Sequence, residues 1–195
     1  MKLFFALVIA TMGSLQPAPG DVFEIDLWPG EGLPVFEAVA TRIELRELPS
    51  ASSRIVQTLV VRPGQRLVFD DTRYRTTKPG RFIALTPTRV TGRTLGDVSR
   101  LSRSDYYSGK FAPAGVDITA GDRIAYLQYR AEGTCFVRIA NAVIDTKPCP
   151  TEMKREFTLE AEPITEWWIH IIVDGEAAGW LLVIDSTAKV VRRVG

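Results

Sequence analysis

The chain contains 195 residues, of which 46% are hydrophobic and 24% are charged, and its formal net charge is +1 at pH 7. This length suits one or two small domains, and the apolar content excludes a disordered polymer. The near-neutral charge argues against a dedicated nucleic-acid-binding protein, so we expect no nucleic acid among the partners.

Residues 1–20 have the pattern of a secretory signal peptide. Lys2 supplies a positive start, residues 3–10 form an apolar run, and residues 11–13 offer small side chains for cleavage. The run is too short to span a bilayer, which requires about 20 residues. A buried N-terminal strand or helix is the alternative. We expect export to the periplasm or the extracellular space, and no transmembrane segment in the mature chain.

Charge is distributed unevenly along the rest of the chain. Residues 21–41 carry five acidic side chains and no basic one, whereas residues 42–110 carry 14 basic and six acidic side chains. Residues 111–195 are mildly acidic. The acidic segment 21–41 could therefore lie across the basic segment 42–110. Alternatively, the basic segment faces an anionic envelope polymer or solvent.

Period-two alternation of apolar and polar residues predicts an all-β fold made of short strands separated by turn signals. The expected strands are residues 39–46, 55–61, 66–69, 81–85, 122–129, 134–139, 157–162, 167–173, 180–184 and 189–194. The spacing of Leu95, Val98 and Leu101 behind Thr94 predicts a short helix. The remainder of residues 72–120 is polar, and we expect long inserted loops there. Short strands of this kind suit a small barrel or sandwich.

Two segments carry a family resemblance. The first is Ile43–Ser53, which is followed by the apolar run 55–59 and by Pro63-Gly64-Gln65. The second is residues 166–171, which include Trp167-Trp168 and precede Gly179-Trp180. Together they resemble the opening strands and the closing hairpin of bacterial SH3-like (SH3b) domains.

The two segments lie much farther apart here than in a single family member. The resemblance therefore implies either one SH3-like barrel with a large insertion or two barrels, of which we favour two, with residues 121–143 as inner strands of the first. We expect residues 1–20 to be the signal peptide and residues 21–147 to form the first barrel region with elaborated loops. Residues 148–195 are then a C-terminal hairpin segment that completes or packs on that region.

Aromatic residues are the first candidates for ligand binding. Adjacent Trp167 and Trp168 must face opposite sides of a strand, so one of them is directed away from the core. We expect Trp168 and Trp180 to form an aromatic groove beside Tyr106 and Tyr107, of the kind that binds peptides or glycans. The alternative is that the tryptophans fill the ends of a small barrel.

A basic cluster supplies a second candidate site. It consists of Arg73, Tyr74, Arg75, Lys78 and Arg81. Such a cluster suits an acidic polymer with phosphate or carboxylate groups. A solvent-facing hairpin is the alternative interpretation.

Cys135 and Cys149 are the only cysteines, and in an exported chain an even pair predicts a disulfide. Two free thiols are the alternative. His170 is the only histidine, and no CxxC occurs, so we expect no metal site. A Cys135–His170 pair would give a nucleophile and its base, but nothing near Cys135 predicts a helix N-terminus that would lower the pKa of its thiol.

Other catalytic signatures are absent from the sequence. It contains no G-x-S-x-G, P-loop or HExxH motif. Adjacent Asp70 and Asp71 would point apart on a strand, so they do not suggest an acid–base pair. We therefore expect no enzymatic activity and no cofactor.

The sequence as a whole predicts an exported, non-enzymatic binding or scaffold protein of the cell envelope. Its expected partners are a peptide, a cell-wall glycopeptide or another envelope protein. The alternatives are an envelope cysteine hydrolase that uses Cys135 and His170, and an inhibitor of an extracellular enzyme.

Overall fold

The computed structural model describes residues 22–27, 34–183 and 190–194, so the predicted signal peptide at 1–20 lies outside the described residues. The described part is mostly β, with a short α1 (Arg103–Ser108) and a 3-10 helix η1 (Pro150–Glu152). The strands are β1 (Phe23–Ile25), β2 (Val35–Ala38), β3 (Arg42–Arg46), β4 (Ile55–Val60), β5 (Phe69–Lys78), β6 (Gly80–Ala84), β7 (Thr88–Gly96), β8 (Arg100–Leu101), β9 (Pro113–Ile118), β10 (Arg123–Tyr129), β11 (Cys135–Ile139), β12 (Ala142–Thr146), β13 (Phe157–Ala161), β14 (Ile164–Val173), β15 (Glu176–Leu182) and β16 (Val191–Val194).

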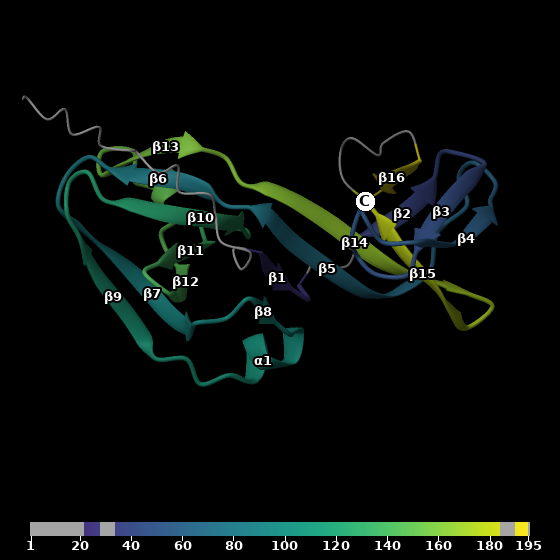
Figure 1. The fold of residues 1–195 in the computed structure, drawn as a ribbon, viewed down its shortest axis with the longest axis horizontal. Helices are drawn as coiled ribbons and strands as arrows, with labels where there is room; N and C mark the ends of the chain where they lie inside the picture. The colour runs from purple at the N-terminus through teal and green to yellow at the C-terminus, as the bar shows by residue number, and fades with distance from the viewer. Residues whose placement is uncertain (1–21, 28–33, 184–189, 195) are drawn as a thin grey trace, which may run out of the picture.

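These strands form three sheets. The first has the order β4-β3-β15-β14-β5-β1-β8, the second has the order β13-β6-β10-β11-β12-β7-β9, and β16 pairs with β2. Figure 1 shows two lobes, joined by the long antiparallel strands β5 and β14. We call the lobe around β2, β3, β4, β15 and β16 the small lobe, and the lobe that contains the second sheet the large lobe.

The small lobe is a sandwich of the first sheet and the β2–β16 ribbon. Alternation in β3 buries Ile43 and Leu45 and exposes the charged residues between them. Opposite lie Phe36 and Ala38 of β2 and Val191 of β16, all in the same apolar cluster. This lobe therefore buries its own core.

The two segments that resemble SH3-like domains meet in the small lobe, because β3 pairs with β15 through Arg46 and Trp180. The predicted inner strands of a first barrel, residues 121–143, instead form β10, β11 and part of β12 in the second sheet. No closed barrel is present among the described strands. The SH3-like character and the number of SH3-like units stay predictions.

The large lobe has apolar clusters on both faces of its sheet. One contains the bonded Cys135 and Cys149 together with residues of β6, β7, β9, β10, β12 and β13. The other joins β1, β8 and α1 to Leu127, Phe136 and Val143. The C-terminal segment 148–195 is divided between the lobes, since β13 pairs with β6 while β15 and β16 belong to the small lobe.

Residues 72–120 differ most from expectation. This region contains most of β5, all of β6 to β9 and α1 rather than long loops. The predicted helix is wrong in position, because Leu95 lies in β7 and Leu101 in β8, both buried. The helix begins one residue after Ser102, whose hydroxyl accepts a hydrogen bond from the Asp105 amide and caps it.

Candidate functional site

The outer face of the first sheet, opposite the small-lobe core, collects charged and aromatic side chains. We call it the charged face. Strand registers place its side chains in three rows that cross the sheet. The rows are Arg46, Trp180, His170 and Asp71; then Leu182, Trp168 and Arg73; then Glu166, Arg75, Glu24 and Arg100.

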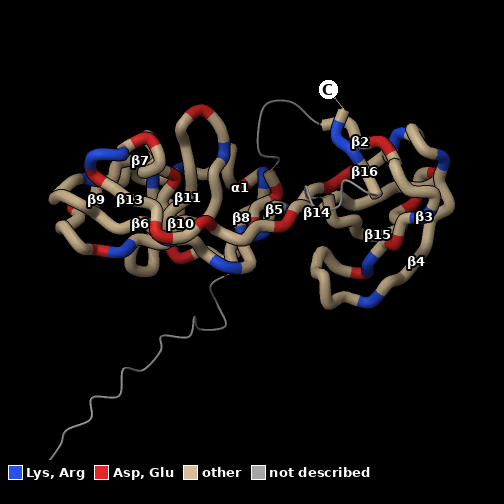
Figure 2. Tube along the Cα trace, turned by 90° about the horizontal axis from the view of Figure 1, so that it is seen from above, with Lys and Arg blue, Asp and Glu red and all other residues tan. Residues whose placement is uncertain are grey.

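The arginines of β5 pair with acidic residues of β1, β5 and β14 and with Asp26, which follows β1. Arg73 lies 3.4 Å from Glu24, 3.1 Å from Asp26 and 2.7 Å from Asp71. Arg75 lies 3.0 Å from Glu24 and also contacts Glu166. The acidic start therefore lies across the basic middle, which was one of the arrangements that the charge pattern predicted. Figure 2 shows positive and negative residues interspersed over both lobes.

Trp168 is buried in the structure, and it borders a cavity of about 450 Å³ whose other walls are not aromatic: Arg42, Glu44, Arg46, Thr58, Leu181, Leu182 and Val190. Its side chain is 0% exposed although it faces away from the small-lobe core, and its indole N–H donates to Glu166 at 3.0 Å. The β3–β4 loop is attached to the same face, because Arg75 donates to the Pro49 carbonyl and Arg46 to the Ser53 carbonyl. Burial of this tryptophan matches the alternative of a core role.

Trp180 is only partly buried and stands at the centre of a mixed stack. The His170 ring lies 4.9 Å from its ring, and the Arg73 guanidinium lies 5.1 Å from the ring centre. His170 Nδ1 is 2.8 Å from Asp70 Oδ1. Trp180 is thus partnered on the face, while His170 belongs to a hydrogen-bonded pair with an exposed carboxylate.

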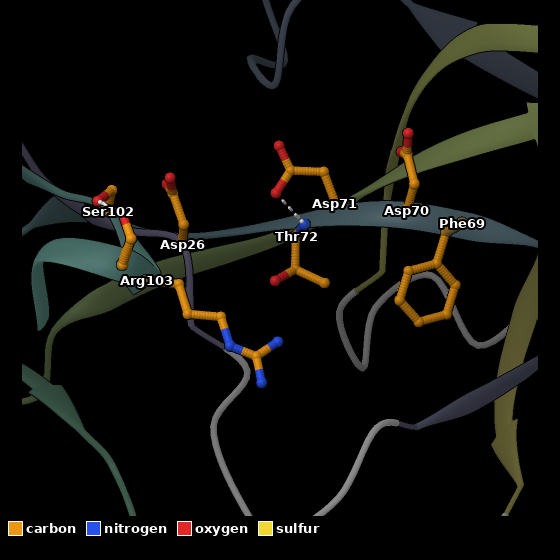
Figure 3. Close-up of a pocket in the computed structure, with 8 residues that line it drawn as sticks. Asp26, Phe69, Asp70, Asp71, Thr72, Ser102 and Arg103 are labelled. Carbon is orange, nitrogen blue, oxygen red and sulfur yellow. Dashed lines mark hydrogen bonds between the residues drawn. The ribbon is translucent and has the colours of Figure 1, made fainter. Parts of the chain in front are cut away.

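A pocket of about 310 Å³ opens where the charged face meets the start of α1 (Figure 3). Its walls come from β5, from the residue after β1 and from the capping turn of α1. They are Asp26, Phe69, Asp70, Asp71, Thr72, Ser102, Arg103 and Ser104. Figure 3 shows the Asp70 and Asp71 carboxylates on one side of β5, and the Phe69 ring, Thr72 and the Arg103 guanidinium on the other.

The pocket combines hydrogen-bond acceptors, donors and an aromatic ring. Asp70 and Asp71 retain 57% and 40% exposure, so both carboxylates remain accessible to a ligand. Asp71 accepts from the Thr72 amide at 2.8 Å, which fixes its orientation. Arg103 supplies donors, whereas the Ser102 and Ser104 hydroxyls are hydrogen-bonded to each other and Ser102 also donates to Asp105. The carboxylates can accept hydrogen bonds from an ammonium group on one side of β5, and the guanidinium can pair with a carboxylate on the other side.

Asp26 forms the inner wall of the pocket and is less accessible. Burial raises the pKa of its carboxyl above the ordinary value, whereas Arg73 and Arg100 oppose that increase. Its side chain is 14% exposed. Asp26 therefore connects the pocket to the ion-pair network rather than serving as a free acceptor.

Tyr106 and Tyr107 lie together on α1, in the large lobe, and not beside the tryptophans of β14 and β15. Tyr106 is buried, and its hydroxyl donates to Asp145 at 2.7 Å, while Arg93 and Arg130 lie over its ring. Burial, followed by the hydrogen bond to Asp145, raises the pKa of Tyr106 to about 12. Tyr107 is 68% exposed. The predicted four-residue aromatic groove is therefore not assembled.

The predicted basic cluster is divided along β5 and β6. Arg73 and Arg75 are occupied by the acids described above, and the Tyr74 ring packs edge-on against Trp167. Arg81 pairs with Glu160 on β13, and Lys78 is exposed at the end of β5. Because the guanidiniums of Arg73 and Arg75 are paired with carboxylates of the same chain, this cluster offers little net positive charge to an anionic polymer.

Cys135 and Cys149 form a disulfide, as the sequence predicts, and both are buried. The bond leaves no thiolate at Cys135, and His170 lies in the other sheet.

Within the described ranges no group of three or more His, Cys, Asp or Glu side chains is arranged to hold a metal ion. No described helix is long and apolar enough to cross a membrane.

Sequence reasoning missed the pocket because its walls are distant in sequence. One signal was local: the start of α1 carries Ser102 three residues before Asp105. Only the pairing of β1 with both β5 and β8 brings these segments together.

Comparisons with protein-family models, with curated proteins and with solved structures gave no match.

Proposed function

We propose that this chain is an exported, non-enzymatic binding protein of the cell envelope, and that the pocket beside α1 is its ligand site. The observation that supports this most is the pocket itself, with two accessible carboxylates, a guanidinium, serine hydroxyls and the Phe69 ring in about 310 Å³. A peptide, or the peptide part of a cell-wall glycopeptide, carries the ammonium, carboxylate and amide groups that these side chains would contact.

The proposed mechanism is recognition by a prearranged set of charges. Asp70 is held by His170 and Asp71 by the Thr72 amide and Arg73, so neither carboxylate has to be ordered when a ligand binds. Asp70 and Asp71 would accept hydrogen bonds from an ammonium group, and Arg103 would pair with a carboxylate.

The disulfide in a chain without a described membrane-spanning helix is compatible with an exported protein. The disulfide also disfavours the alternative of a cysteine hydrolase, because a catalytic Cys135 needs a free thiolate. Inhibition of an extracellular enzyme has no particular observation in its favour.

Calorimetric titration with short peptides tests the proposal. The probes are lysine-containing tripeptides with free termini, together with the same peptides acetylated at the amines and amidated at the carboxylate. We expect the free peptides to bind the wild type, and Asp70→Asn and Arg103→Gln to weaken binding by at least about tenfold each.

Asp117→Asn and Arg89→Gln are matched controls. Asp117 and Arg89 are of the same residue types as Asp70 and Arg103. They form an exposed ion pair in the large lobe, with 2.6 Å between Asp117 Oδ1 and Arg89 Nη1. Affinities within about twofold of the wild type are expected for both, as is usual for surface positions. Equal binding of free and blocked peptides, or equal losses in pocket and control variants, would contradict the proposal.

A further inference from the structure

β4 forms one end of the first sheet, and its free edge differs from the other sheet edges. Its sequence, Ile-Val-Gln-Thr-Leu-Val, contains no charge, proline or glycine. Ile55, Val56 and Val60 are 43%, 42% and 81% exposed. A bulge opposite Leu45 and Arg46 is the one irregularity in its pairing with β3.

The remaining edges of the two large sheets carry features that discourage strand addition. β8 has only two residues. β13 has a bulge near its end and the charged Glu160, and β9 starts at Pro113 and contains Gly115 and Asp117. Short strands, bulges, prolines and charges protect edges in this way. β4 is therefore the edge that the fold leaves most open to pairing.

Backbone register shows which groups of β4 face outward. The Val61 amide donates to the Thr41 carbonyl at 3.0 Å, in the same register that pairs Val60 with Arg42. Hydrogen-bonded pairs alternate in an antiparallel ladder, so Leu59 and Gln57 bond to β3. The N–H and C=O groups of Thr58 and Val60 therefore point away from β3 toward the free edge.

Charge at the end of the strand restricts what can pair there. Arg62 follows β4, and Arg42 lies opposite Val60; both are exposed, and neither forms an ion pair among the described residues. A second copy placed symmetrically about Thr58 would bring its Arg54 opposite Arg62. Like charges at opposed positions are unfavourable. An extended strand that carries acidic residues at this end avoids that repulsion.

We propose that β4 is a docking edge for an extended segment of a partner protein. The segment would add antiparallel to β4, with β-branched residues along its centre and acidic residues at its N-terminal end, beside Arg42 and Arg62. Backbone hydrogen bonds to Thr58 and Val60 would supply affinity, and the arginines would set the direction. This inference is separate from the pocket and does not depend on it.

Binding of a synthetic peptide tests the inference. The probe is acetyl-Asp-Glu-Thr-Val-Thr-Val-Thr-amide with a fluorophore, measured by anisotropy against the full chain. Its controls are the same peptide with lysines in place of both acids, and one with alternate backbone amides methylated. We expect the acidic peptide to bind, and both control peptides to bind at least about tenfold more weakly.

Two variants of β4 locate the interaction. Thr58→Pro removes an N–H that β3 does not use, and an edge strand is where proline is tolerated. Val60→Asp places a negative charge beside the acidic end of the segment. Each should weaken peptide binding at least about tenfold, while Leu159→Lys, an exposed apolar position on edge strand β13, should change it less than about twofold. Asp70→Asn should leave this binding unchanged, which separates the edge from the pocket.

Three outcomes would overturn the inference: no binding of the acidic peptide, equal binding of the lysine peptide, or full binding by a folded Val60→Asp chain. Thermal unfolding of each variant shows whether the chain is folded. Sedimentation of the wild type completes the test. A dimer that Thr58→Pro dissociates would assign the edge to a second copy instead of a partner strand.

Discussion

Replacement of Trp168 separates a core role from a role in ligand contact. The side chain is fully buried, and Trp→Ala at such sites costs about 3–5 kcal/mol of unfolding free energy. Trp168→Phe retains most of the apolar volume but loses the indole N–H bond to Glu166. A hydrogen bond to a charged group contributes about 1.5–3 kcal/mol, so we expect a loss of about 2 kcal/mol.

Urea unfolding followed by circular dichroism measures both losses. Tyr107→Ala is the control, because that ring is 68% exposed and its removal should change stability by less than about 0.5 kcal/mol. A Trp168→Ala chain as stable as the wild type would refute the assignment of Trp168 to the core. Trp168 would then again be a candidate for ligand contact.

Three further predictions concern single contacts. Replacing both Cys135 and Cys149 by Ser should lower stability by about 3 kcal/mol in urea, and reductant should then have no effect on the double variant. Because the folded-state pKa of Tyr106 is raised to about 12, its contribution is complete below pH 10 and is lost as the pH rises from 10 to about 12. Tyr106→Phe should reduce this alkaline loss in thermal unfolding, and an unchanged pH profile would refute the role of the hydroxyl. Gly179→Ala should destabilise more than Gly64→Ala, since both have positive φ but only the first would push a Cβ against the Arg46 carbonyl, 2.9 Å away; equal melting temperatures would contradict this.

Apolar alternation was enough to predict many of the strands. β4, β10, β11 and β13 follow the predicted ranges closely, and β3 lies within its range, because apolar residues alternate with polar ones or form a run in each sequence. The disulfide followed from composition and expected compartment. These features depend on local sequence, which explains why they could be predicted.

β5 could not be predicted in the same way. Its sequence is polar and reads as a loop, yet it is ten residues long and connects the lobes. Its charged side chains are accommodated because Glu24, Asp26 and Glu166 arrive from distant strands. Local propensity contains no information on such partners.

The pocket and the burial of Trp168 depend on the same long-range pairing. The sequence correctly restricts Trp167 and Trp168 to opposite faces, but both faces turn out to be covered at this point. The covering loop is held by Arg75 and Arg46, whose targets are backbone carbonyls with no sequence signature. Tertiary contacts thus decide which aromatic residues can meet a ligand.

Mapping of amide chemical shifts on isotope-labelled protein, during titration with the free lysine tripeptides, tests the proposed ligand site most directly. We predict that the shifted amides cluster at residues 69–72 and 102–104, which form the pocket, and that Asp70→Asn removes these shifts. Shifts centred on any other part of the chain, or no shifts at all, would contradict the proposal.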